Sequence, residues 1–227
     1  MTPFSSALIT SLALLAMLVI APPAYYHYLP MALGGEGVEA LASALQTRGR
    51  PYLIGIALLF CVYVLDVLVA WGLYGYFDGD RKGFGRLAAW SRLVYAALAF
   101  VSLSFSLSAY EVANSAQMAA SASPESLRLA VTLNHETAGA IMSVAWAFFG
   151  VHLIILSVTI FKSSLVPFWI GLPVLLAGLA YTVPISASYL APHVDLSLLS
   201  AMTPGELVLI LWLVFSLWKT RRQAFAR

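Results

Sequence analysis

The sequence predicts an all-α integral membrane protein, a polytopic bundle of six transmembrane helices that forms a single domain over residues 1–227. Of the 227 residues, 61% are hydrophobic and 10% are charged, whereas soluble domains are about 45 to 50% apolar and about 25% charged. Six windows are apolar over roughly the 20 residues that a helix needs to cross a hydrocarbon core of about 30 Å. These observations exclude a soluble globular domain.

The predicted spans run over Leu8 to Tyr26, Tyr52 to Phe77, Leu87 to Tyr110, Glu136 to Phe161, Val166 to Leu190 and Pro204 to Trp218. The first could instead be a cleaved signal peptide, because it is N-terminal and ends in the small residues of "APPAYY". A signal peptide has a basic n-region, and "MTPFSS" contains no Lys or Arg, so we expect a retained helix.

Basic residues are distributed unevenly over the connections between the spans. One set of alternate connections, together with the C-terminus, carries Arg81, Lys82, Arg86, Lys162, Lys219, Arg221, Arg222 and Arg227. The opposite side carries only Arg48, Arg50 and Arg128. The positive-inside rule therefore places both termini in the cytoplasm. The net charge of +2 is accounted for by this topology and indicates no nucleic-acid partner.

The connections predict three local features. Residues 36–48 have the spacing of a short amphipathic helix, which we expect at the outer interface of the membrane. In "SASPESLRLAV", Ser123 is suited to cap a helix that begins at Pro124 and can continue into the fourth span. The loops "DGDRKGFGR" and "KSSL" are short, so spans two and three, and spans four and five, should be antiparallel neighbours.

Three polar residues lie deep inside the predicted spans: Asp66, Arg92 and His152. A charged side chain at the centre of a transmembrane helix costs about 2.5 to 3.5 kcal/mol, so each of these residues needs a partner. At 1.5 Å per residue, they lie about 16, 9 and 14 Å from the inner ends of their helices. An arginine side chain can reach across the difference, so we predict an Asp66–Arg92 ion pair with His152 in the same layer.

The third span carries a stripe that should point inward. Its members recur at spacings of three and four: Arg92, Tyr95, Ala99, Ser102 and Ser106. This periodicity is typical of one helix face.

The fourth span has two distinct faces. His152 shares one face with Phe148. The other carries a strip of small residues, Gly139, Ser143 and Ala147, which is suited to close helix packing.

Two interpretations of the polar layer remain open. It can be architectural, holding the helices in register, or it can be a working site in which His152 titrates. A haem site would need a second histidine at the same depth, and His135 lies 17 residues earlier on the same helix. We therefore expect His152 to bond a backbone or hydroxyl group, and we expect no cofactor.

A second polar group is expected towards the outer side of the membrane. It contains Glu111, His135, Glu136, His193 and Glu206. Glu206 ends "TPGE", which has the pattern of a capping box with Pro204 at the first helical position. Glu136 falls in a first helical turn, where the helix dipole favours an anion. Capping accounts for these acids, so we predict no metal site.

Five motifs in order resemble a known family. They are "VLDVLVAWGLY", "SRLVYAA", "FFGVHLIIL", "LVPFWIGLPVLLAGLAYTV" and "GELVLILWLV". Together they look like the bacterial multi-pass membrane proteins called domain of unknown function 4386. The resemblance implies a six-helix fold in the bacterial cytoplasmic (inner) membrane and supplies no established activity. It also implies a recurring set of residues, which falls here on Asp66, Arg92, His152, Tyr181 and Glu206.

Two classes of function follow. We prefer a non-enzymatic membrane protein that binds a lipid, a small hydrophobic ligand or another membrane subunit, with the polar layer fixing its packing. The alternative is an intramembrane enzyme or proton-linked transporter, with His152 as the titrating group, Asp66 orienting it and Arg92 as an electrostatic anchor. Secondary candidates for a polar pocket are Tyr95, Ser102, Ser106 and Tyr181. The sequence contains no HExxH or GxSxG motif that would supply a strong catalytic group.

Overall fold

The computed structural model describes residues 2–33, 40–80, 82–191 and 193–225, and every regular element within these ranges is helical. Six helical segments of this described part are long and apolar enough to cross a membrane. They are Phe4–Leu33, Gly49–Phe77, Gly83–Asn114, Pro124–Lys162, Phe168–Ser188 and Ser197–Trp218. The predicted all-α fold with six spans is confirmed, and the cytoplasmic location of both termini stays a prediction.

The first span is longer than the sequence predicted. It comprises α1 (Pro3–Pro23), the π-helical turn η1 (Ala24–Tyr28) and α2 (Leu29–Leu33). A proline inside a helix lacks the N–H and clashes with the carbonyl four residues earlier. Here Pro22 and Pro23 precede the wider π-helical turn, which lets the helix continue past the predicted end at Tyr26.

A short helix, α3 (Leu41–Thr47), precedes the second span, α4 (Gly49–Phe77). It falls within the helix predicted at residues 36–48, of which residues 36–39 lie outside the described residues. The side-chain amide of Gln46 donates a hydrogen bond to the Ala113 carbonyl at 2.7 Å. This bond ties α3 to the end of the third span, α5 (Lys82–Asn114).

The fourth span begins well before its predicted start at Glu136. After α6 (Ala116–Ser121), α7 runs from Pro124 to Lys162. The Ser126 N–H donates to the Ser123 side-chain oxygen at 3.1 Å, which is the cap that the sequence predicts. With 39 residues, α7 is about 58 Å long, roughly twice the thickness of the hydrocarbon core.

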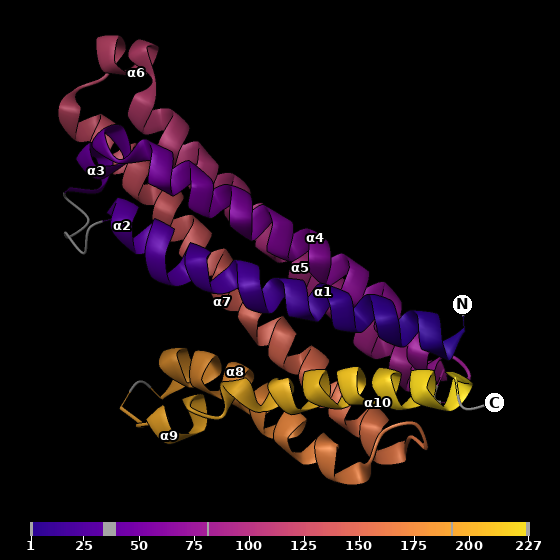
Figure 1. Cartoon of the computed structure of the whole chain (residues 1–227). Helices are drawn as coiled ribbons and strands as arrows, with labels where there is room; N and C mark the ends of the chain where they lie inside the picture. The colour runs from indigo at the N-terminus through magenta and orange to yellow at the C-terminus, as the bar shows by residue number, and fades with distance from the viewer. Residues whose placement is uncertain (1, 34–39, 81, 192, 226–227) are drawn as a thin grey trace. The chain divides into compact units, whose positions relative to one another are not determined.

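The C-terminal helices lie together in Figure 1. They are η3 (Phe168–Ile170), α8 (Gly171–Leu190), α9 (Ser197–Ser200), η4 (Thr203–Glu206) and α10 (Leu207–Phe225). The capping box predicted in "TPGE" is wrong, because η4 is a 3-10 turn whose N-cap is Met202, with no side-chain cap bond. The Gly205 N–H donates to the Met202 carbonyl at 3.0 Å, so the backbone supplies the cap.

The chain forms two compact units, each assembled from several segments. Unit 1 comprises Met1–Ala16, Leu65–Ala96 and Ser143–Arg227, and unit 2 comprises Met17–Val64 and Ala97–Met142. Several long helices contribute residues to both units. The single domain over residues 1–227 stays a prediction.

In unit 1, Asp80 links two short loops by hydrogen bonds. One carboxylate oxygen of Asp80 accepts hydrogen bonds from the Ser163 hydroxyl at 2.6 Å and from the Ser164 N–H at 3.1 Å. The Tyr76 hydroxyl adds a long hydrogen bond to the Leu165 carbonyl at 3.5 Å. The loop that leads from α4 to α5 therefore contacts the loop that follows α7.

Helices α7 and α8 approach closely at two glycines. A Cβ atom added to Gly150 would lie 2.6 Å from the Gly178 carbonyl oxygen, and one added to Gly178 would lie 2.8 Å from the Gly150 carbonyl oxygen. No side chain fits at that separation. A Cβ atom added to Gly139 would meet nothing within 4 Å. Of the small-residue strip predicted on this helix, Gly139 thus has no such close neighbour, whereas Ala147 lies one turn before Gly150 and its carbonyl is 3.4 Å from the Thr182 hydroxyl on α8.

Candidate functional site

The candidate site is a buried polar cluster in unit 1 formed by Asp66 on α4, Arg92 on α5 and His152 on α7. Arg92 Nε donates to Asp66 Oδ1 at 2.8 Å, and Arg92 Nη2 lies 2.5 Å from the same oxygen. Asp66 and His152 are fully buried, and Arg92 is 2% exposed. The structure thus brings together the three residues that the sequence singled out.

His152 connects the third span to the fourth through both ring nitrogens. Nδ1 lies 2.8 Å from the Ala88 carbonyl oxygen, and Nε2 lies 3.3 Å from Arg92 Nη1. Because a carbonyl oxygen can only accept, Nδ1 carries the hydrogen and Nε2 accepts from the guanidinium. This arrangement uses a neutral imidazole as a hydrogen-bond acceptor for Arg92.

An aromatic group adjoins the cluster. The Arg92 guanidinium carbon lies 5.2 Å from the centroid of the Phe149 ring, and that ring lies 5.9 Å from the His152 ring. A cation over an aromatic face is attracted by the ring quadrupole. Phe149 is 4% exposed, whereas Phe148, which the sequence placed on this face, is 39% exposed. Both lie one turn before His152, and only packing selects between them.

Two of the four secondary candidates belong to this aromatic group. The Phe149 ring lies 4.9 Å from Tyr95 and 5.1 Å from Tyr181. Trp146 completes the group by stacking on Tyr181 with ring centroids 5.3 Å apart. Tyr95 and Tyr181 therefore contact the side chain that covers Arg92.

The other two secondary candidates lie in unit 2 and are not part of the cluster. The Ser102 hydroxyl donates to the Ala138 carbonyl at 2.7 Å, and the Ser106 hydroxyl donates to the Ser102 carbonyl at 3.2 Å. The Ser106 carbonyl in turn accepts from the Tyr52 hydroxyl at 3.0 Å. These contacts fasten helices within unit 2.

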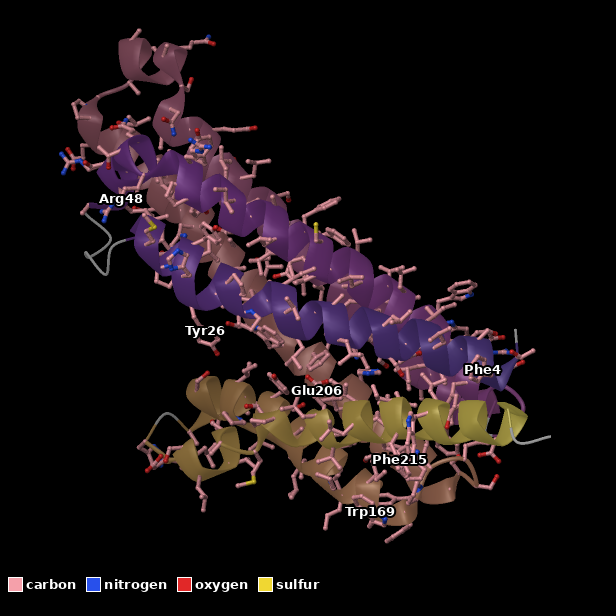
Figure 2. All side chains as sticks on the ribbon, in the orientation of Figure 1. Phe4, Tyr26, Arg48, Trp169, Glu206 and Phe215 are labelled. Carbon is pink, nitrogen blue, oxygen red and sulfur yellow. The ribbon has the colours of Figure 1, made fainter. Side chains whose placement is uncertain are left out.

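The predicted outer polar group is divided between the units. Glu111, His135 and Glu136 lie in unit 2. Glu206 lies in unit 1 at the end of η4, directly before α10 (Figure 2), and its carboxyl is within electrostatic range of Arg92 and Asp66. Within the described ranges, no group of three His, Cys, Asp or Glu residues could hold a metal ion.

The sequence grouped Glu206 with residues expected on the outer side, because it lies at the start of a span. The structure adds Arg92 and Asp66 as electrostatic neighbours of its carboxyl. The outer-side position of Glu206 stays a prediction.

One oxygen of the cluster is unsatisfied. Asp66 Oδ2 is buried and has no hydrogen-bond partner among the residues that the structure describes. A buried carboxylate oxygen without a donor costs free energy. The cluster therefore keeps one acceptor available for a proton or another donor.

Outside the spans, Asp195 lies between α8 and α9. Its carboxyl accepts a hydrogen bond from the Ser197 N–H at 2.9 Å, and this bond lowers the pKa of the carboxyl. The residue is exposed and engaged at the start of α9. It offers no buried site.

A lateral groove lies on α4 and α5 within unit 1. Its volume is about 530 Å³, and it is lined by Val67, Ala70, Trp71, Tyr74, Arg86, Ala89, Trp90 and Leu93. Trp71 and Trp90 are 52% and 58% exposed. The two helices that form this groove are those that the Asp66–Arg92 ion pair joins.

Comparison with known proteins confirms the resemblance seen in the sequence. The model of a family described as "Domain of unknown function (DUF4386)" matches residues 9–216. An uncharacterized protein of Archaeoglobus fulgidus is 24% identical over 179 residues, which cover 78% of this chain and 92% of that protein. No solved structure matches the chain. Asp66, Arg92, His152 and Glu206 all lie within the matched range.

Proposed function

The chain belongs to the family described as a domain of unknown function (DUF4386), and we propose from its own geometry that it is a non-enzymatic membrane protein that binds a lipid in the groove of α4 and α5. The observation that carries this proposal is the groove itself. Its volume of about 530 Å³ lies within the range of ligand pockets. Its walls are mostly apolar, and its exposed tryptophans lie on membrane-spanning helices, where lipid has direct access.

The buried polar cluster supports this function as a structural element. Asp66 and Arg92 hold α4 against α5, and His152 adds α7 through its bond to the Ala88 carbonyl. Each nitrogen of Arg92 and His152 already has a protein partner. Both side chains are therefore held in place by contacts within the protein. The cluster therefore keeps the groove preformed, which lowers the cost of binding.

Native mass spectrometry of the detergent-purified protein tests the proposal. We expect the wild-type chain to retain one lipid per chain. Leu93→Trp should fill the groove and reduce the lipid-bound fraction several-fold. Leu133→Trp is the matched control, because Leu133 is also exposed but lies on α7 in unit 2. Equal lipid retention by all three proteins would contradict the proposal.

A second candidate function is proton-linked transport, and it is favoured by Asp66 Oδ2, which has no hydrogen-bond partner within the described ranges. Arg92 supplies one positive charge near two carboxyls, Asp66 and Glu206. Charge balance in a membrane interior then calls for one further proton or cation. The sequence suggested His152 as the titrating group, but both of its ring nitrogens are engaged in hydrogen bonds. The exchanging proton in this candidate is therefore carried by the carboxyl groups of Asp66 and Glu206.

Proton flux into liposomes that contain the purified protein and a trapped pH-sensitive dye tests this candidate. This candidate predicts flux through the wild-type protein and its loss in Glu206→Gln. Glu111→Gln removes an exposed carboxylate from unit 2 and should leave the flux unchanged. If liposomes that contain the wild-type protein are no more permeable to protons than protein-free liposomes, proton transport is excluded.

A further inference from the structure

We infer that the groove selects a lipid with an anionic phosphate headgroup from the cytoplasmic leaflet, and that Arg86 binds the phosphate. This inference rests on the proposed lipid-binding function and adds the headgroup class and the leaflet. It depends on the two unlike ends of the groove.

One end of the groove is polar and the other is apolar. Tyr74 near the end of α4 and Arg86 near the start of α5 form the polar end, and Val67 and Leu93 form the apolar end. The two ends are seven residues apart on each helix, about 10 Å at the rise of an α-helix. A ligand that matches both ends has a charged head and an apolar tail.

Arg86 brings a positive charge that has no acidic partner among the described residues. Its guanidinium carbon lies 5.7 Å from the centroid of the Tyr74 ring. In the part of the chain that the structure describes, no carboxylate forms an ion pair with it, in contrast to Arg92, which is paired with Asp66. A guanidinium presents several donors in a plane and binds phosphate in a bidentate manner. The free charge of Arg86 is therefore complementary to a lipid phosphate.

Arg86 lies near the end of a membrane-spanning helix, at the depth expected for a lipid headgroup. It lies one turn inside α5, and the sequence just before it carries two further basic residues, Arg81 and Lys82. The positive-inside rule assigns this basic end of α5 to the cytoplasmic side. Anionic lipids in that leaflet are attracted to basic residues at the membrane surface, and basic pockets on helices at this side bind lipid headgroups. The exposed Trp71 and Trp90 lie between the two ends of the groove, where they would flank the part of the acyl chain nearest the headgroup.

Quenching of tryptophan fluorescence by brominated lipids tests the inference on the full chain in detergent. Phosphatidylglycerol and phosphatidylcholine with the same brominated acyl chains are titrated separately. We expect saturable quenching by both, with half-saturation at an about five-fold lower concentration of phosphatidylglycerol, which is the contribution of one basic residue near a membrane surface. The preference should decrease at 1 M salt, because salt screens exposed charges.

Four variants test which residues are responsible for the quenching and for the headgroup preference. Trp71→Phe combined with Trp90→Phe should remove the saturable quenching. Arg86→Gln should abolish the preference for phosphatidylglycerol, Arg86→Lys should keep part of it, and Arg128→Gln, which removes an exposed arginine of unit 2, should keep all of it. The thermal midpoint of each variant in detergent checks that it is folded.

The possible outcomes separate the inference from the function on which it rests. Saturable quenching with no headgroup preference in the wild type, or a preference that survives Arg86→Gln, overturns the inference and leaves lipid binding standing. No saturable quenching by either lipid overturns both. A lipid-free dimer that dissociates on Trp71→Phe and Trp90→Phe assigns the groove to a second copy of the chain and also overturns both.

Discussion

At the residue scale, the molecule places a full ion pair inside a membrane-spanning bundle and surrounds it with protein partners. Arg92 binds Asp66, His152 and the face of Phe149. Breaking such a pair from one side leaves an uncompensated buried charge, which is more costly than removing both members. The energetic role of the pair therefore appears only when single and double variants are compared.

Asp66→Asn and Arg92→Met should each lower the free energy of unfolding in detergent by about 3 to 5 kcal/mol, because each leaves one buried charge unpaired. The double variant should recover part of that loss, with a coupling energy of about 1 to 3 kcal/mol. Denaturant titrations followed by circular dichroism measure all four proteins. Glu111→Gln, a control at an exposed carboxylate, should stay within about 0.5 kcal/mol of the wild type. Two single variants as stable as the wild type would refute a structural role for the pair.

At the element scale, helix separation depends on which small residues meet. Transmembrane helices gain little from the hydrophobic effect when they associate in lipid, so close backbone contact and interhelical hydrogen bonds carry the association. Gly150 and Gly178 provide that contact between α7 and α8. The Thr182 hydroxyl, one turn after Gly178, donates to the Gly178 carbonyl at 3.0 Å and lies 3.4 Å from the Ala147 carbonyl.

Gly150→Ala should destabilise the protein by about 1 to 3 kcal/mol, because the added methyl group would overlap the α8 backbone. Gly139→Ala makes the same change on the same helix, where a Cβ atom meets nothing within 4 Å. Alanine has the higher helix propensity, so Gly139→Ala should be neutral or stabilising by up to about 1 kcal/mol. Thermal unfolding in one detergent compares the two variants. Equal effects would show that the close contact of α7 with α8 does not contribute to stability.

At the scale of the whole molecule, six spans and an uneven distribution of basic residues predict one orientation in the membrane. Exposed apolar side chains such as Leu12, Val19 and Phe60 lie on these spans. On a membrane protein they face lipid and need no protein partner. The orientation itself depends on charges in the loops, which the membrane insertion machinery reads.

Cysteine labelling in intact cells tests this orientation. Cys61, the lone and exposed cysteine of the chain, is first replaced by serine. Glu125→Cys in the first turn of α7 should react with a membrane-impermeant maleimide, whereas Gly79→Cys in the loop before α5 should react only after the cells are permeabilised. A Cβ atom at Gly79 meets no neighbour within 4 Å, so the new side chain is tolerated. The opposite labelling pattern would place both termini outside the cytoplasm.

The sequence by itself determined the features that follow from the bilayer or from neighbouring residues. The six spans follow from the length and polarity that a membrane crossing requires. The cap at Ser123 follows from local backbone geometry. The expectation that Asp66, Arg92 and His152 meet follows from the cost of an unpaired polar group in a membrane, which leaves few other partners at that depth.

Only the tertiary structure decided which face meets which neighbour. Spacings of three and four restrict a residue to one side of a helix, but they do not distinguish Phe149 from Phe148 or Gly150 from Gly139. Sequence spacing likewise did not show that Glu206 lies within electrostatic range of Arg92, which only the folded chain brings about. These choices depend on helix separation and rotation, which are set by contacts between residues far apart in the chain and have no local signature.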